Sequence, residues 1–364
     1  MTKINVESDV AGSVESLKTA SNPRLAWVDY ARALAITLVV YRHTMVGLNR
    51  SGLHVPSFLY NIQEFLYNVR MPVFVILSGM FLGRSLLRKS TRQQITSKVS
   101  SLLYPYFVWT LIFITIQIFL STYTNSKRTW HDYLYIITDP RELDHMWYLV
   151  ALFTTSCILI IVAPVLLKRP VLHLAIAFVL YLMHYFLVDY SILFYFCYYY
   201  IFLCIGVHAS SWILPLDKKS NKWLAGLLIT VLPFFIAGQL FWLHNIGPNY
   251  EPDNNWYIIP FFFIILVACV TFYAVCRLLY NAGILRSISV LGKASLYIYI
   301  LHLLFISSFR IICLNIFHIE NVYVIILGSL VAGITGPYLI YRLSLKWRGI
   351  HYLFSLEKKQ TANG

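Results

Sequence analysis

The chain has 364 residues, of which 59% are hydrophobic and only 12% are charged. Soluble domains carry about a quarter charged residues, so this composition excludes an ordinary soluble enzyme, a disordered chain and a nucleic-acid binder. The formal net charge of +14 is expected to collect in short loops on one side of a membrane. We therefore predict an all-α polytopic membrane protein embedded in a lipid bilayer.

The chain divides into a polar arm, an apolar body and a basic tail. Residues 1–24 are polar and lack the apolar stretch of a signal peptide, residues 25–343 form the membrane domain, and residues 344–364 form the tail. A spanning helix needs about 20 mainly apolar residues. About ten segments meet that length, near 25–47, 65–87, 101–121, 145–167, 171–188, 191–209, 223–243, 256–280, 288–307 and 322–343.

The distribution of lysine and arginine predicts the orientation of these helices. With the N-terminus in the cytoplasm, 21 of the 29 cationic residues fall in inner segments and five in outer segments. The outer five are Arg50, Lys127, Arg128, Arg141 and Arg310. Cytoplasmic loops of membrane proteins carry such an excess, and an even number of spans then returns the C-terminus to the cytoplasm.

The first predicted helix carries Asp29, Arg32 and His43 inside an apolar stretch. Charge within a bilayer is costly and marks a functional site by default. Arg32 and His43 are 11 residues apart, which is roughly 20° past three full turns and about 16 Å along the axis. They therefore share one face, and Asp29, one turn before Arg32, can pair with it. The alternative is an interfacial Asp–Arg pair with an unrelated histidine.

Further polar residues lie at a depth similar to that of His43. Arg70 stands in the outer third of the second helix, His145 opens the fourth beside Trp147, and His302 lies in the outer half of the ninth. A single buried histidine is more often structural, but several such groups at one level favour a shared site. On packing grounds alone, Ser78 and the glycine after it favour a close helix contact over a catalytic serine. The six cysteines show no metal-ligand or disulfide spacing, so we expect no metal.

In chain order, these motifs resemble the membrane acyltransferase-3 family, which O-acylates carbohydrates. The matching elements are Arg32-x10-His43 with Asp29 before it, Arg70-Met-Pro to Ser78-Gly79, Leu103-Tyr-Pro105-Tyr106, His145-Met-Trp147, and Ser295 to His302. The resemblance implies an acyl-CoA donor, usually acetyl-CoA, delivered from the cytoplasm, and a carbohydrate acceptor handled at the outer side. It also implies a multi-pass protein of the bacterial cytoplasmic (inner) membrane.

The resemblance and the chemistry of the side chains together assign roles. His43 is the candidate for removing a hydroxyl proton or accepting the acyl group, because imidazole does either near neutral pH. Arg32 would orient the donor or stabilise developing negative charge, and Asp29 would hold Arg32. The candidate substrate-binding residues are Arg70, Ser78, His145, Trp147 and His302.

The loop after the second helix is the candidate site for the phosphates of CoA. Arg88, Lys89 and Arg92 are its candidate ligands, flanked by Arg84 and Lys98, with no acid between residues 84 and 100. Arginine and lysine bind phosphate well, although positive-inside topology alone would account for part of this charge.

Three alternatives stay open at this level. The acyl group is expected to be acetyl, with succinyl as the alternative. The reaction passes either through an acyl-histidine or through direct attack by the activated hydroxyl. The competing function is a transporter or flippase for a lipid-linked sugar, which would move its solute without consuming acetyl-CoA.

Overall fold

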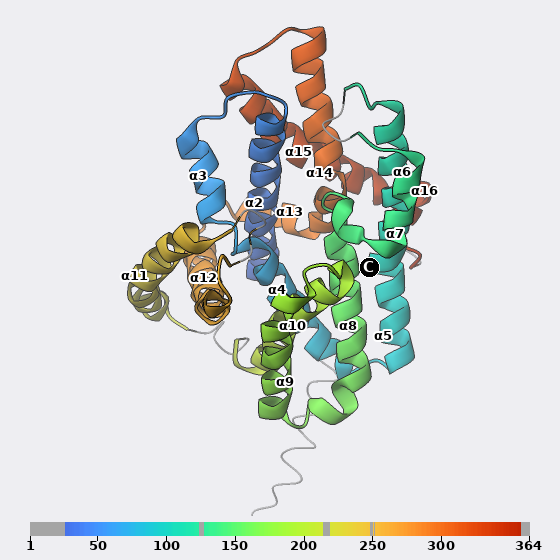
Figure 1. The fold of residues 1–364 in the computed structure, drawn as a ribbon. Coiled ribbons are helices and arrows are strands. Elements are labelled where there is room, and N and C mark those ends of the chain that lie inside the picture. The colour runs from blue at the N-terminus through green and yellow to red at the C-terminus, as the bar shows by residue number, and fades with distance from the viewer. Residues whose placement is uncertain (1–25, 124–126, 214–218, 248–249, 251, 358–364) are drawn as a thin grey trace, which may run out of the picture.

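The computed structural model describes residues 26–123, 127–213, 219–247, 250 and 252–357. Helices make up most of these residues, and the only β pairing among them is an isolated bridge between Ile246 and Pro252. The predicted arm 1–24 lies outside the described residues. The principal helices (Figure 1) are α2 (Ala26–Arg50), α3 (Ser57–Phe65), α4 (Arg70–Leu86), α5 (Thr91–Lys98), α6 (Tyr104–Phe119), α8 (Trp147–Leu166), α9 (Pro170–Met183), α10 (Ser191–Ile213), α11 (Asn221–Asn245), α12 (Ile258–Asn281), α13 (Ser289–Lys293), α14 (Ser295–Ile311), α15 (Val322–Ser344) and α16 (Arg348–Tyr352).

Nine helical segments in the described part of the chain are long and apolar enough to cross a membrane. They are Ser57–Leu86, Thr91–Phe119, Trp147–Leu166, Pro170–Leu187, Ser191–Ser210, Asn221–Asn245, Asn255–Asn281, Ser295–Ile316 and Val322–Ser344. They correspond to nine of the ten predicted spans and confirm an all-α polytopic membrane protein. The remaining predicted span is the first in the chain and corresponds to α2. This helix has 25 residues but includes four charged side chains, which lower its hydropathy. The cytoplasmic placement of both termini stays a prediction.

Three predicted starts differ from the structure. The second span begins at Ser57 instead of 65, because helix α3 precedes α4 with only residues 66–69 between them. The third span begins at Thr91 instead of 101, because the polar helix α5 continues through a π-helical turn, Val99–Leu103, into α6. Pro105 follows this turn, and a proline ring clashes with the carbonyl four residues earlier, which opens the helix there. The ninth span begins at Ser295 instead of 288, because residues 289–293 form the separate helix α13.

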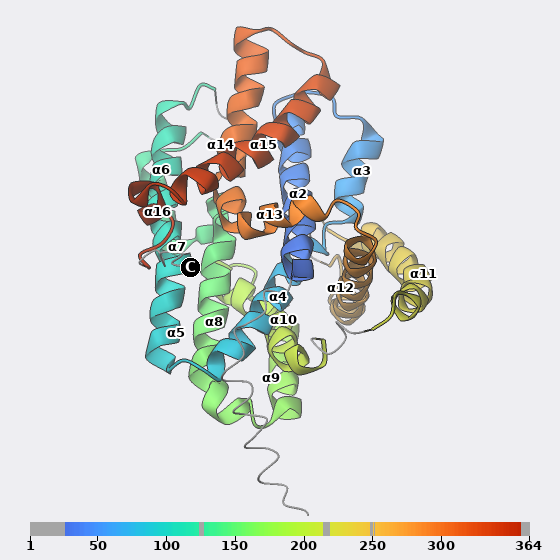
Figure 2. The same ribbon diagram turned by 180° about the vertical axis from the view of Figure 1, so that it is seen from behind.

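Helix α2 lies in the middle of the bundle. It contacts α4, α12, α13, α14 and α15, and both views place it between the α11–α12 pair at one edge and α5–α6 at the other (Figures 1 and 2). Tyr30, Ile36, Val40 and Met45 along it are almost fully buried. A charged helix can occupy this position because its neighbours separate it from lipid.

Helices α4 and α10 cross in close contact at a pair of glycines. A Cβ atom placed on Gly79 would lie 2.3 Å from the carbonyl oxygen of Leu203, and one on Gly206 would lie 2.2 Å from that of Ile76. Only glycine fits at both positions. This contact confirms the close approach expected for the Ser78-Gly79 segment and fixes the axis of α4, which carries Arg70 at its start.

The beginning of the predicted tail packs on the bundle. Phe354 is 1% exposed and stacks on Tyr297 of α14 with ring centroids 3.9 Å apart. The indole N–H of Trp109 in α6 donates to the carbonyl of Leu353 at 3.0 Å. The residues after α15 therefore connect α6 to the start of α14.

Candidate active site

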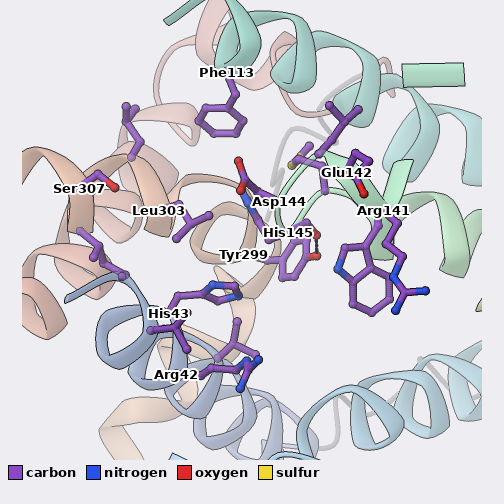
Figure 3. A pocket seen from close by; sticks show the side chains of 18 of the residues that line it. Arg42, His43, Phe113, Arg141, Glu142, Asp144, His145, Tyr299, Leu303 and Ser307 are labelled. Carbon is purple, nitrogen blue, oxygen red and sulfur yellow. Dashed lines mark hydrogen bonds between the residues drawn. The ribbon is translucent and has the colours of Figure 1, made fainter. Parts of the chain in front are cut away.

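A pocket opens where α2 ends and α4 begins, which is the end of the bundle that the charge distribution predicts to face outward; we call it the outer end. The pocket has a volume of about 640 Å³. Side chains from α2, α4, α6, α10, α14 and the segment before α8 line it (Figure 3). Its walls thus come from helix ends far apart in the sequence.

Three histidines meet at this pocket. The ring centroid of His43 lies 4.9 Å from that of His302 and 6.2 Å from that of His145, and the centroids of His145 and His302 are 4.8 Å apart. His43 and His145 line the pocket (Figure 3), whereas His302 does not line it and is fully buried behind them. The structure therefore brings together three residues selected from sequence for their similar depth.

Backbone carbonyls fix which nitrogen of two of these rings carries the hydrogen. His145 Nε2 lies 2.9 Å from the carbonyl oxygen of Ile300, and His302 Nδ1 lies 3.0 Å and 2.7 Å from those of Ile298 and Tyr299. A carbonyl only accepts, so each of these nitrogens is an N–H donor. In the neutral rings, His145 Nδ1 and His302 Nε2 then carry lone pairs, and neither atom has a hydrogen-bond partner among the described residues.

Tyr299 joins the histidine cluster from α14. Its hydroxyl donates to the backbone carbonyl of His145, and its ring lies beside that of His145 with centroids 5.4 Å apart. Tyr299 also lines the pocket. It therefore ties α14 to the turn that carries His145.

A second cluster forms around Arg42, the residue before His43. Its guanidinium carbon lies 4.6 Å from the ring centroid of Tyr67 and 4.5 Å from that of Tyr250, and these two rings stack at 3.8 Å. Arg42 also bonds Gln63 at 2.7 Å and approaches Glu64 at 3.9 Å. Arg42 is thus a paired cation on the wall of the pocket.

Arg70 completes this side of the pocket and is 5% exposed. Its Nε donates to the carbonyl oxygen of Tyr67 at 3.4 Å, and its guanidinium carbon lies 5.0 Å from the Tyr67 ring centroid. Among the described residues it has no carboxylate within 4 Å. Nearby, burial raises the pKa of Tyr250 to about 12, so that its hydroxyl stays protonated and donates to Glu64 at 2.6 Å.

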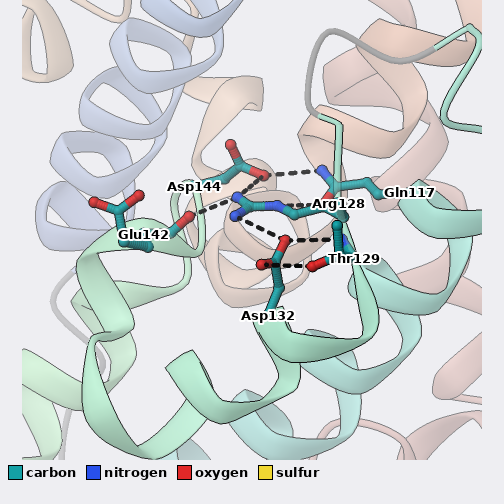
Figure 4. Close-up of polar contacts among 6 residues, drawn as sticks. All are labelled: Gln117, Arg128, Thr129, Asp132, Glu142 and Asp144. Atoms are coloured by element: carbon teal, nitrogen blue, oxygen red, sulfur yellow. Dashed lines mark hydrogen bonds and ion pairs between the residues drawn. The ribbon is translucent and has the colours of Figure 1, made fainter.

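An arginine clamp holds the segment that carries His145 (Figure 4). Arg128 approaches the carboxylate of Asp144 at 3.6 Å and that of Asp132 at 3.8 Å, and it bonds the side chain of Gln117 at 3.2 Å. Gln117 of α6 in turn donates to Asp144 at 2.9 Å. Asp144 has a φ of 52°, a left-handed conformation that asparagine and aspartate tolerate best. The clamp therefore holds the turn directly before His145.

Trp147, on the next turn, stacks on Tyr195 with ring centroids 4.0 Å apart and lines the pocket. The side chain thus presents a rigid aromatic face near the histidines.

Two of the remaining predicted site residues, Asp29 and Arg32, lie towards the opposite end of the bundle, and Ser78 lies midway along α4. Asp29 is 4% exposed at the start of α2, where the α carbon of Gly292 packs against its backbone so closely that a Cβ would lie 1.8 Å from the Asp29 carbonyl oxygen. Arg32 lies with its guanidinium carbon 4.7 Å from the Phe81 ring centroid. Ser78 lies near the hydroxyl of Tyr148. None of Asp29, Arg32 and Ser78 lines the pocket.

Arg88 and Lys89 are exposed in the turn between α4 and α5, and Arg92 is exposed in the first turn of α5. All three lie beyond the end of α4 opposite to Arg70, and the 17 residues of α4 span about 24 Å between its two ends. The structure therefore divides the sequence candidates into a histidine pocket at one end and a cationic turn at the other.

Sequence reasoning missed Arg42, Tyr299, Arg310 and the Arg128 clamp. Arg42 and Arg310 were visible as cations near helix ends, and Arg42 met the same intramembrane criterion as Arg32. Arg310, 3% exposed, donates to the carbonyl of Gly47 at 2.8 Å and so binds an end of α2. In the described part of the chain, no set of three or more histidine, cysteine, aspartate or glutamate side chains is placed to hold a metal ion.

Comparison with known proteins identifies the family of the chain. A search of curated proteins and a search of solved structures each gave no match. A family model described as an acyltransferase domain matches residues 25–342, which include all of α2 to α14 and nearly all of α15. The chain therefore belongs to the acyltransferase-3 family and is a membrane acyltransferase.

Proposed function

We propose that this protein transfers an acetyl group from cytoplasmic acetyl-CoA to a sugar hydroxyl of a surface polysaccharide or of its lipid-linked precursor. In this proposal the protein works in a bacterial inner membrane. The observation that supports the proposal is the meeting of His43, His145 and His302 at one pocket. Acyl transfer to a hydroxyl needs a group that takes the hydroxyl proton, and imidazole is suited to that task.

In this proposal His43 is the reacting group and His302 orients it. His173 and His208, elsewhere in the chain, form an N···N hydrogen bond of 3.0 Å with ring centroids 5.1 Å apart. The His43 and His302 centroids are 4.9 Å apart, so an N–H of His43 can reach the unpartnered Nε2 of His302. The other nitrogen of His43 then carries a lone pair towards the pocket. A base held by a third group is the arrangement expected at an activated nucleophile.

The steps balance in either of two forms. In direct attack, His43 takes the proton of the sugar hydroxyl, the oxygen attacks the thioester carbonyl, the C–S bond breaks, and the imidazolium returns the proton to the CoA thiolate. In the two-step form, the lone-pair nitrogen of His43 attacks the thioester carbonyl, the C–S bond breaks, and the CoA thiolate takes the proton of the other ring nitrogen. The sugar hydroxyl then attacks the acyl-histidine, its oxygen takes the acyl group, and its proton returns to the ring. A rapid quench in neutral denaturant with labelled donor and no acceptor separates the two forms, because only the second leaves label on the protein.

The acceptor and the donor are assigned to opposite ends of the bundle. Arg70, His145 and Trp147, all of which line the pocket, would bind the sugar. Arg88, Lys89 and Arg92 would bind the phosphates of CoA. Helix α2 is continuous from Ala26 to Arg50, so Arg32 and His43 keep the predicted separation of about 16 Å. Arg32 would orient the donor along this distance with Asp29 beside it, while Ser78 and the nearby Tyr148 offer hydroxyls between the two ends.

The test compares His43→Ala with the unchanged protein in membranes supplied with labelled acetyl-CoA, and it measures CoA release together with label on carbohydrate. We expect His43→Ala to accumulate normally and to lose acyl transfer. The control is His173→Ala, which removes a buried histidine outside the pocket and is expected to leave activity unchanged. Substantial glycan labelling by His43→Ala contradicts the assignment. Solute movement without CoA release by the unchanged protein indicates a transporter or flippase instead.

A further inference from the structure

The cations at the outer end of the protein gather in one place. The charge distribution assigns five lysine and arginine residues to the outer segments, and all five line the pocket. They are joined there by Arg42 and Arg70, which the charge distribution places within the spans. The seven are Arg42, Arg50, Arg70, Lys127, Arg128, Arg141 and Arg310. Figure 3 shows Arg42 and Arg141 reaching the pocket from different elements.

The acids of the outer segments are distributed differently. Among the acids in the part of the chain that the structure describes, only Glu142 and Asp144 line the pocket. Counting also Glu64 and Asp132, which pair with Arg42 and Arg128, the described residues bring four acids to the seven cations, a surplus of three positive charges within this part of the chain. Other acids of these segments, Asp139, Asp189, Asp253 and Glu320, do not line the pocket.

Arg70 places part of this positive charge in the buried portion of the pocket wall. It is 5% exposed, and its hydrogen bonding within the described residues consists of the bond from Nε to Tyr67. An arginine buried without a carboxylate is costly, and an anion bound in the pocket would lower that cost. A cleft lined by charge of one sign also concentrates ligands of the opposite sign.

We infer that the acceptor carries an anionic oxygen group, a carboxylate or a phosphate, which binds at Arg70 and is drawn in by the cations of the pocket. The inference rests on the proposed function and narrows its acceptor to acidic sugars or to sugars linked to a lipid phosphate. The guanidinium of Arg70 offers a planar pair of donors to either group. His43 lines the same pocket as Arg70, so a hydroxyl of a sugar bound at Arg70 can approach His43.

The test measures binding to the full-length protein in nanodiscs of zwitterionic lipid, without acyl donor. One pair of probes is an oligogalacturonide and its carboxyl-reduced neutral counterpart, and the other is a polyprenyl diphosphate and the matching polyprenol. We expect the anionic member of at least one pair to bind about tenfold more tightly than its neutral counterpart. High salt should reduce that difference. The pair that shows it distinguishes an acidic sugar from a lipid phosphate.

Variants test whether the difference arises at Arg70. Arg70→Gln should abolish it, Arg70→Lys should keep part of it, and Lys222→Gln, an exposed cation of α11 outside the pocket, should keep all of it. Should Arg70→Gln fail to accumulate, the double variant Lys127→Gln/Arg141→Gln replaces it and should reduce the difference. Equal binding within both pairs, or a difference unchanged in these pocket variants, overturns the inference.

A transfer assay separates this inference from the proposed function. With acetyl-CoA present, equal kcat/KM for the anionic and neutral members of each pair overturns the inference and leaves an acyltransferase. Preferential binding of an anionic probe without transfer to any acceptor contradicts the proposed function and supports the anion site.

Discussion

Two substitutions of His302 separate the structural role of its ring from its proposed role beside His43. The amide of asparagine replaces the Nδ1 side of a histidine ring, so His302→Asn keeps a donor for the carbonyls of Ile298 and Tyr299, which accept from Nδ1 at 3.0 Å and 2.7 Å. The amide of glutamine reaches the position of Nε2, so His302→Gln keeps an acceptor beside His43. The two variants therefore differ mainly in what they offer to the His43 ring.

The size of the expected effect follows from one hydrogen bond. His43 becomes positively charged when it takes the hydroxyl proton, and a hydrogen bond to a charged group is worth about 1.5–3 kcal/mol. Since about 1.4 kcal/mol corresponds to a tenfold change in rate, His302→Asn should lower kcat by roughly 10- to 100-fold. His302→Gln should lower it by less than about tenfold. The KM for the acceptor should change little in either, because His302 does not line the pocket.

The assay follows CoA release from acetyl-CoA by purified protein in nanodiscs, as a function of pH, with the thermal unfolding midpoint measured for each variant. His302→Asn should shift the pH profile, since it alters the proton affinity of His43, whereas the control His173→Asn should not. Equal rates for the asparagine and glutamine variants, or losses that follow the unfolding midpoint, would refute the positioning role of His302.

Three further predictions concern other parts of the bundle. Arg32→Lys should impair turnover, because ammonium lacks the planar fork of guanidinium, and Arg32→Ala should be far worse; wild-type rates in both would remove Arg32 from the site. Gly79→Ala should lower the unfolding midpoint, because its Cβ would lie 2.3 Å from a carbonyl oxygen of α10 and overpacking costs about 1–3 kcal/mol; an unchanged midpoint contradicts the close crossing. Neutralising Arg88, Lys89 and Arg92 together should raise the KM for acetyl-CoA and spare that of the acceptor, and equal changes in both would reject the donor assignment.

The positions of the spans and of the histidines were largely predictable from the sequence. Hydropathy identifies nine of the ten predicted spans. Each of these helices has an almost continuous apolar surface, part of which is buried in the bundle while the rest faces lipid. The 11-residue spacing of Arg32 and His43 carries over because α2 is unbroken. His145 and His302 were selected by their depth and by the family motifs that contain them, and side chains at one depth of a bundle of membrane-spanning helices lie in the same layer.

The residues that shape the pocket wall were less predictable. Tyr67 and Tyr250 stack through contacts between segments more than 180 residues apart, and aromatic residues near helix ends are common for a separate reason, their preference for the membrane interface. Arg128 likewise holds Asp144 and Gln117 through a loop whose conformation local sequence does not dictate. Such contacts depend on tertiary arrangement, which no local pattern encodes.

The distribution of charge along α2 and α4 fits the proposed division of labour. In α4, Arg70 and Arg84 stand near opposite ends, and no charged residue lies between them. In α2, the stretch from Ala33 to Tyr41 is likewise uncharged and separates Arg32 from Arg42. The pantetheine arm of CoA is uncharged and hydrogen-bonding, while the CoA phosphates and the proposed acceptor are anionic. In the proposed reaction, the donor reaches from one side of the membrane to an acceptor on the other. This requires cations at both ends, which bind the CoA phosphates and the anionic acceptor, and hydroxyls between them, which bind the pantetheine arm.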